Sequence, residues 1–257
     1  MSKPLIFISN DDGIWAPGIK ALVEVAKNYG EVIVVAPDKP QSGQGHAVTI
    51  KEPIRLTRVD AFSGVESWEC SGTPADSVKL AKDKILKDRK VDLVLSGINH
   101  GSNASINIIY SGTMSAAMEG ALEGLNSIGF SLDDYSHDAD FSGAKVYAGK
   151  VIEMSLDNKF NGTFLLNVNI PRLKNDEIKG IKVCRQSNGK WVEEFMEATD
   201  PRGVPYYWMT GKFENLEPEA TDTDLWAIKN GYVSIVPSCF DLTNHSLISK
   251  LNFFSNE

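Results

Sequence analysis

Short apolar runs alternate with helix-like segments over residues 1–170, and this alternation constrains the fold more than any other feature. The runs are short, continuous and rich in Val, Ile and Leu, which is typical of strands covered on both faces of a parallel sheet. We expect strands at residues 5–8, 32–36, 92–96, 128–132 and 163–170, and helices at 17–26, 74–86, 112–125 and 144–156. This order predicts an α/β fold with a doubly wound, mostly parallel sheet and right-handed crossovers.

Local signals support the helix starts. Pro17 and Pro74 stand where the first two helices begin, because proline has its φ already set for a first helical position. Thr73 precedes Pro74 and is the predicted N-cap of the second helix. Two further short strands are expected between these helices, at residues 48–50 and 54–59.

The pattern becomes less regular after Asn158, where β ribbons and turns replace the strand–helix alternation. We expect ribbons at residues 181–186, 191–196 and 206–209. This part carries the large aromatic side chains Trp191, Tyr206, Tyr207, Trp208 and Trp226. Neither a linker nor a repeat separates it from the rest. The chain is therefore predicted to be one domain, residues 1–257, with a core of about 1–170 and a C-terminal extension of about 171–257 that reaches partner subunits.

The charge balance limits the partners. Lysine and arginine total 26 against 34 aspartate and glutamate residues, a net charge of −8, which argues against a nucleic-acid polymer but not against a small anionic substrate. Cys70, Cys184 and Cys239 lie far apart, which favours reduced thiols in a cytoplasmic protein over disulfides or a zinc site. No apolar run approaches the length of a membrane span, and the first residues do not resemble a signal peptide.

Polar loops follow three of the predicted parallel strands. The first contains Asp11 and Asp12, whose adjacent carboxylates repel each other unless a cation or a proton lies between them; a simple tight turn is the alternative. The second contains Ser42 between small and polar residues, and the third contains Asn99 and Asn103. Two carboxylates, a hydroxyl and an amide oxygen form a set of hard ligands, which favours Mg²⁺, Mn²⁺ or Ca²⁺ over zinc or copper.

Ser111, Gly112 and Thr113 lead directly into a helix of small residues. Free N–H groups at a helix start can bind phosphate, whereas the alternative is an ordinary N-cap before a closely packed helix. If phosphate binds there, a side chain at Gly112 is expected to weaken phosphate binding and leave metal binding near normal, because the candidate metal ligands lie on other loops.

Other catalytic motifs are absent from the sequence. It has no dinucleotide-binding glycine motif, no P-loop, no nucleophile elbow and no HExxH pair. His46 and His100 fall in the polar loops and are candidates to line a substrate pocket. Asp241 and His245 stand four residues apart, and we favour a local lock on the C-terminal segment over an acid couple.

The polar loops and helix starts form an ordered set of motifs that resembles the SurE family of metal-dependent nucleotidases over nearly the whole chain. The motifs lie at residues 8–19, 35–43, 72–78, 96–103 and 110–120. Shorter motifs follow in the expected order, ending with Asp241 to Ser246. The resemblance implies a Rossmann-like core whose C-terminal extensions are exchanged between subunits of a homodimer or homotetramer.

The resemblance also implies an activity: hydrolysis of nucleoside 5′-monophosphates, and of 3′-monophosphates, with one divalent cation, Mg or Mn, per subunit. The family's metal ligands match Asp11, Asp12, Ser42 and Asn99, and its phosphate-side residues match Asn103, Ser111, Gly112 and Thr113. Asp11 or Asp12 is the expected catalytic group that orients the attacking water and takes its proton. A non-catalytic regulator that binds nucleotide or metal on the same fold is the alternative.

Overall fold

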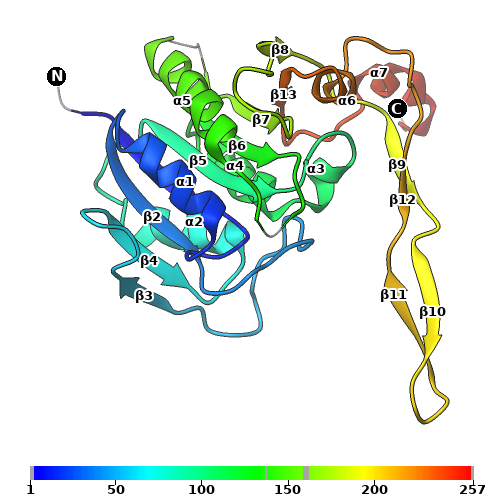
Figure 1. Ribbon diagram of the computed structural model, residues 1–257, viewed down its shortest axis with the longest axis horizontal. Helices are drawn as coiled ribbons and strands as arrows, with labels where there is room; N and C mark the ends of the chain where they lie inside the picture. Colours follow the sequence, from blue (N-terminus) through cyan, green and yellow to red (C-terminus); the bar gives the residue numbers. More distant parts are fainter. Residues whose placement is uncertain (1–2, 137, 159–161, 256–257) are drawn as a thin grey trace.

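The computed structural model describes residues 3–136, 138–158 and 162–255. Its centre is one large sheet, shown in Figure 1. The strands of this sheet are β1 (Leu5–Ser9), β2 (Glu31–Pro37), β3 (Leu56–Val59), β4 (Glu66–Cys70), β5 (Leu93–His100), β6 (Ser127–Leu132), β7 (Leu165–Ile170), β8 (Ile181–Val183) and β13 (Val233–Ser238). They are arranged in the order β3-β4-β2-β1-β5-β6-β7-β13-β8.

The sheet is mostly parallel, as the alternating sequence pattern predicts. From β4 through β2, β1, β5 and β6 to β7, each strand is parallel to the next. Only β3 against β4 and β13 against β7 are antiparallel. The chain leaves β1 toward β2 on one side and later returns to place β5 on the other side, so the strand order reverses at β1. In open α/β sheets, ligands bind at the carboxyl ends of strands next to such a reversal.

Helices cover both faces of the sheet. The longer helices are α1 (Pro17–Ala26), α2 (Pro74–Lys84), α4 (Gly112–Leu122) and α5 (Ser142–Asp157). Apolar residues of α1 and α5 pack in the main core cluster on one face, and α2 packs with the start of α4 on the other. Thr73 caps α2 as predicted, because its hydroxyl accepts the Asp76 N–H while Asp76 accepts the Thr73 N–H.

The strand expected at residues 48–50 does not form. Its backbone is bound to helix α2 instead, since the Thr49 N–H donates to both carboxylate oxygens of Asp76 and the Thr73 hydroxyl donates to the Ala47 carbonyl. Ile50 is left exposed. The apolar alternation of this stretch therefore does not correspond to a buried face.

The sheet continues beyond residue 170, where the core is expected to end. Strand β13 pairs with β7 from Ser234 to Ser238, and β8 pairs with β13. The short helix α6 (Asp224–Lys229) precedes β13 and packs against it. The C-terminal part of the chain thus includes two strands of the central sheet, and only some of it projects from the body.

The projecting part is a long β ribbon, residues 189–215, which we call the arm. Strand β9 (Gly189–Val192) pairs with β12 (Lys212–Asn215) at its root, and β10 (Phe195–Thr199) pairs with β11 (Pro205–Met209) toward its tip. Figure 1 shows the arm extending well away from the sheet. Its outer half exposes large side chains, among them Phe195, Met196, Tyr206, Tyr207, Trp208 and Met209. Trp191 and Trp226, in contrast, are partly buried.

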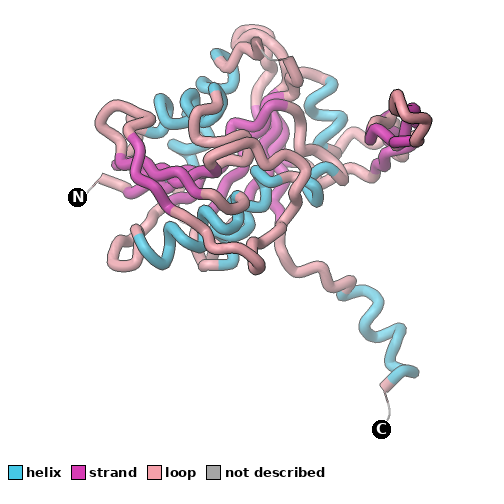
Figure 2. Tube along the Cα trace, turned by 90° about the horizontal axis from the view of Figure 1, so that it is seen from below, coloured by secondary structure: helices cyan, strands magenta, loops and turns pink. Residues whose placement is uncertain are grey.

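The C-terminal segment also leaves the body, as Figure 2 shows. It consists of α7 (His245–Ile248) and a 3₁₀ helix, Ser249–Phe254, both without buried residues. The expected pair of Asp241 and His245 is formed at 2.9 Å, between the segment that precedes α7 and the first residue of that helix. Of the helices in the described parts of the chain, none has the length and apolar character needed to cross a membrane.

Candidate functional site

The loops after β1, β2 and β5 lie together at the point where the strand order reverses. The Gln41 N–H donates to the Asp11 carbonyl at 2.7 Å, and the Ile14 N–H donates to the Pro37 carbonyl at 2.9 Å. These two bonds join the loop that carries Asp11 and Asp12 to the loop that carries Ser42. Backbone hydrogen bonds therefore hold two of the three predicted loops together.

Asp11 is the most enclosed of the four candidate metal ligands, with 3% of its surface exposed. One carboxylate oxygen accepts the Thr113 hydroxyl at 2.5 Å. Burial, followed by the charge of neighbouring Asp12, raises the pKa of Asp11 to about 6, against the lowering effect of hydrogen bonds from the Thr113 side chain and backbone. The beginning of α4 therefore faces this carboxylate.

Asp12 lies in a more open position. It is only partly buried, and its Oδ2 is 3.5 Å from Nδ1 of His100. The His100 ring packs edge-on against Phe141, with ring centroids 5.0 Å apart. His100 thus belongs to the site, as its loop position predicts, with one ring nitrogen facing a candidate metal ligand.

Asn99 reaches the site through an irregularity in β5. The register between β5 and β6 shifts between Ser96 and Asn99, and Gly97 occupies the turn with φ of 114°. A Cβ at Gly97 would lie 2.3 Å from the Phe130 carbonyl oxygen, so only glycine fits. The Asn99 amide donates to the Gly101 carbonyl at 2.8 Å, which leaves its oxygen available as a ligand.

The donor set fits a hard divalent cation. Asp11 and Asp12 place two carboxylates side by side, and within the described ranges neither forms an ion pair with a lysine or arginine. The exposed hydroxyl of Ser42 has no hydrogen-bond partner among the described residues. Asn10 adds a buried amide oxygen without a partner beside them. Where the structure describes the chain, no three His, Cys, Asp or Glu side chains converge, so the fit depends on oxygen ligands of mixed type.

Asn103 lies in a buried polar network rather than at an open surface. Its backbone N–H donates to Asn169 at 2.7 Å, and its carbonyl accepts from Asn167 at 2.9 Å. Its side-chain amide donates to the Ser131 hydroxyl at 2.8 Å. Asn167 and Asn169 were missed by sequence reasoning, although two asparagines on one side of an otherwise apolar strand are a visible signal.

Helix α4 begins as predicted, but its first residues also serve Asp11. Ser111 is the N-cap, because its hydroxyl accepts the Met114 N–H at 3.0 Å. A Cβ at Gly112 would lie 2.6 Å from Asp11 Cβ and 2.9 Å from its Oδ2. A side chain at Gly112 would therefore press on Asp11, so this geometry argues against the expectation that metal binding stays near normal.

His46 contacts helix α4 and, through Glu119, is linked to α2. Its Nε2 is 2.8 Å from a carboxylate oxygen of Glu119 on α4, and the other oxygen binds Lys79 of α2. The neighbouring Gly45 carbonyl accepts the Ser115 hydroxyl. These contacts hold the second loop onto α2 and α4.

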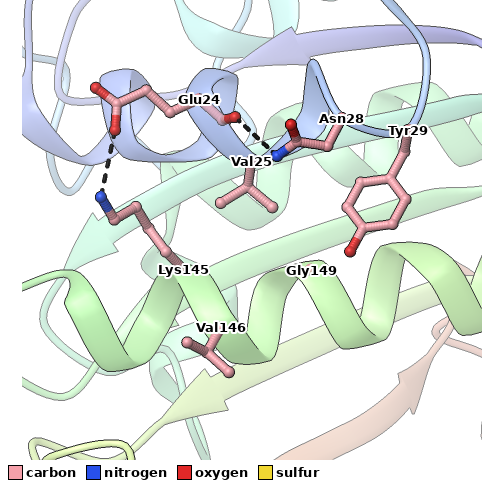
Figure 3. A pocket seen from close by; sticks show the side chains of 7 residues that line it. All are labelled: Glu24, Val25, Asn28, Tyr29, Lys145, Val146 and Gly149. Carbon is pink, nitrogen blue, oxygen red and sulfur yellow. Dashed lines mark hydrogen bonds and ion pairs between the residues drawn. The ribbon is translucent and has the colours of Figure 1, made fainter.

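A separate surface pocket lies between α1 and α5, with a volume of about 340 Å³. Figure 3 shows Glu24 of α1, and Asn28 and Tyr29 in the turn after it, facing Lys145 and Gly149 of α5. None of the residues that line this pocket belongs to the loops that carry Asp11, Ser42 and Asn99. It plays no part in the candidate site.

Comparisons with known proteins place the whole chain beside one family. The family model "Survival protein SurE" matches residues 6–193. The 5′-nucleotidase SurE of Cytophaga hutchinsonii is 56% identical over 98% of this chain and 97% of the relative. The 5′-nucleotidase SurE of Christiangramia forsetii is also 56% identical, over the same shares. The crystal structure of the SurE protein from Aquifex aeolicus has a TM-score of 0.85 and 40% identity, covering 98% of this chain and 100% of that chain.

Proposed function

Because the chain belongs to the SurE family, we propose that it is a metal-dependent phosphomonoesterase that hydrolyses nucleoside 5′-monophosphates to nucleoside and phosphate. The 5′-nucleotidase relatives span almost the full chain, which supports this activity. Hydrolysis of 3′-monophosphates is a further part of the proposal. The observation that carries it is the pair Asp11 and Asp12, two adjacent carboxyl groups at the strand-order reversal, next to the start of α4, without a lysine or arginine partner among the described residues.

Asp11, Asp12, Ser42 and Asn99 are the proposed ligands of one divalent cation per subunit, with Mg²⁺ and Mn²⁺ favoured by the oxygen set. When bound, such a cation withdraws charge from a phosphate oxygen and lowers the pKa of water. The fixed amide of Asn99 and the bond from Thr113 to Asp11 hold two of these ligands in place before any cation arrives.

The chain's own groups supply the remaining chemistry. One of the two aspartates orients the attacking water and accepts its proton. Asn103, Ser111, Gly112 and Thr113 are the proposed phosphate-side residues, and the first-turn N–H groups of α4 are suited to stabilise charge on the phosphate oxygens. Since Thr113 already donates to Asp11 through both its hydroxyl and its backbone N–H, the backbone N–H of Gly112 is the better candidate for phosphate contact.

We further propose that the protein forms a homodimer or homotetramer through the arm and the C-terminal helices. The exposed aromatic and aliphatic side chains on these two projecting segments support an assembly role. Cys70, Cys184 and Cys239 form no disulfide, in line with the cytoplasmic location expected from cysteine usage.

The test is release of inorganic phosphate from a nucleoside 5′-monophosphate with Mn²⁺, with Mg²⁺ and with a chelator. Phosphate release should require the cation, and Asp11→Asn or Asp12→Asn should lower kcat/KM on the order of 100-fold or more. Asp60→Asn, the same change at an exposed residue after β3, is the matched control and should behave as wild type. Saturable nucleotide binding without phosphate release would instead favour the non-catalytic regulator.

A further inference from the structure

A second buried carboxylate, Asp224, lies outside the proposed metal site. It is the first residue of α6 and has 0% of its surface exposed. Its Oδ2 accepts the Ser105 N–H at 2.8 Å, and its Oδ1 accepts the Ser187 N–H at 3.0 Å. A carboxylate without water is costly unless its oxygens are hydrogen-bonded, and here the donors come from two segments distant in sequence.

Ser105 lies in residues 101–106, the segment that also carries Asn103 and that we call the phosphate-binding loop. Ser105 follows Asn103 by two residues and adopts φ of 57°, which is uncommon for a residue with a side chain. Asn103 is held on its other side by Asn167 and Asn169 of β7. The loop is therefore fixed between the β7 asparagines and Asp224.

The Ser187 side of the link belongs to the root of the arm, just before β9. The Ser187 carbonyl accepts the Ser105 hydroxyl at 2.9 Å, so the two segments are joined directly as well. Gly189 packs closely, since a Cβ there would lie 2.8 Å from the Ser105 hydroxyl oxygen. Trp191 adds a second direct bond between the two segments, because its ring N–H donates to the Asn107 side-chain oxygen at 2.8 Å.

The chemistry of Asp224 matches its two distant donors in a way that an amide cannot. A carboxylate accepts through both oxygens, whereas asparagine accepts through one and presents an NH₂ group at the other position. An NH₂ group there would face either the Ser105 or the Ser187 N–H, donor against donor. The two N–H donors therefore explain why a carboxyl group, with two accepting oxygens, occupies position 224.

We propose that Asp224 is a positioning residue for the phosphate-binding loop: it fixes residues 101–106 against the root of the arm, so that Asn103 keeps its place at the active site. This inference rests on the proposed phosphatase function for its kinetic consequence. The structural part, the immobilisation of the loop, is independent of that function.

The test compares full-length Asp224→Asn with Asp222→Asn. Asp222 lies two residues away, is exposed and pairs with Arg185 at 2.9 Å, so it is a matched control for the same change. In Asp224→Asn, amide hydrogen exchange of residues 103–107 should be about 10-fold faster or more. The kcat/KM for a nucleoside monophosphate should fall roughly 10- to 100-fold, as for loss of other positioning partners. Mn²⁺ affinity should change less than kcat/KM does, because Asp11, Asp12 and Ser42 lie on other loops and only the fourth proposed ligand, Asn99, bonds to this loop, at Gly101.

A purely structural role predicts a different result: lower thermal stability, with loop exchange and kcat/KM of the folded variant equal to those of Asp222→Asn. That result would overturn the proposal. If Asp224→Asn does not fold, Asp224→Glu keeps two accepting oxygens but displaces them from the Ser105 and Ser187 N–H groups, and it should give the same pattern at smaller size. Unchanged exchange in that variant overturns the proposal equally. Wild-type protein that releases no phosphate would refute the proposed function, while the exchange measurement would still decide the role of Asp224.

Discussion

At the residue scale, the two adjacent aspartates are not equivalent. Asp11 is buried beneath the start of α4 and bonded to Thr113, whereas Asp12 is partly exposed and lies beside His100. The asymmetry gives them different properties in the metal-free protein. Asp11 has its pKa raised by burial first and by the Asp12 charge second, so it is the carboxylate whose ionisation opposes folding.

The stability of the metal-free protein should therefore depend on pH through Asp11. Its pKa is about 6 in the folded state against an ordinary value of 3.8, so the folded protein binds the extra proton and stability falls as pH rises from about 4 to 6. The loss attributable to Asp11 is on the order of 3 kcal/mol. Asp11→Asn removes it. Denaturant unfolding with a chelator should show the variant matching wild type near pH 4 and exceeding it at pH 7.

Other carboxylates that titrate in this range are common to both proteins and cancel in the comparison. Parallel pH profiles for wild type and Asp11→Asn would contradict the burial of a charged Asp11. Asp12→Asn is an informative companion, because it removes the neighbouring negative charge that, after burial, raises the pKa of Asp11. It should recover part of the same stability at pH 7.

The residues of the candidate site were predictable from sequence where they follow a strand directly. Asp11 and Ser42 are examples, because an apolar run, its polar end and the parallel-sheet pattern together specify the edge at which they lie. Asn169 and Asp224 were not, since each acts on a residue far along the chain, Asn103 and Ser105 respectively. Such pairs depend on tertiary packing, which local patterns do not encode.

At the scale of elements, the start of α4 has two tasks. The sequence predicts a helix start suited to phosphate, and the structure places the same turn against Asp11. The proposed metal and phosphate sites would consequently share Gly112, because the absence of a side chain there lets the Asp11 carboxylate lie against the helix.

Gly112→Ala should accordingly weaken both kinds of binding. The added Cβ would lie 2.6 Å from Asp11 Cβ, so the carboxylate must move, and Mn²⁺ affinity should fall at least about 10-fold together with phosphate affinity. Calorimetric titration of Mn²⁺ and of inorganic phosphate measures each separately. Thr113→Ser keeps the hydroxyl on Asp11 and is the control in the same helical turn. An alanine variant with weak phosphate binding but normal Mn²⁺ affinity would show that the two sites are independent.

Element positions were predicted best where one local signal suffices. Helix α1 begins at Pro17 and α2 at Pro74, as the prolines indicate. The strand expected at residues 48–50 fails because side chains of the α2 cap, Thr73 and Asp76, compete for its backbone. Strand alternation describes side chains, and it does not show where backbone N–H groups find their partners.

At the scale of the whole molecule, the C-terminal part divides into two kinds of structure. Strands β8 and β13 extend the central sheet, while the arm and the C-terminal helices project from it. The loss of the strand–helix alternation after Asn158 is visible in the sequence. Which ribbons rejoin the sheet is not, because β13 pairs with β7 across more than sixty intervening residues.

The outer part of the arm, residues 193–211, can be removed while its root strands and the central sheet stay intact, which makes its role testable. Val192 and Lys212 are register partners at the end of the root, so residues 193–211 can be replaced by an Asn-Gly turn, the sequence preferred in two-residue hairpins. The root contacts of Trp191 and Ser187 with the phosphate-binding loop stay in place. The body should therefore remain folded, with a melting temperature within several degrees of wild type.

The assembly should not survive this change. The deleted segment carries the exposed Tyr207 and Trp208, each 61% exposed in the single chain, and burying such side chains contributes much of the free energy of a stable interface. Light scattering should give a dimer or larger species for wild type and a smaller species for the shortened chain at equal concentration. Tyr207→Ser with Trp208→Ser in the intact arm should shift the mass the same way. If both variants keep the wild-type mass, the C-terminal helices alone hold the subunits together and the arm has another purpose.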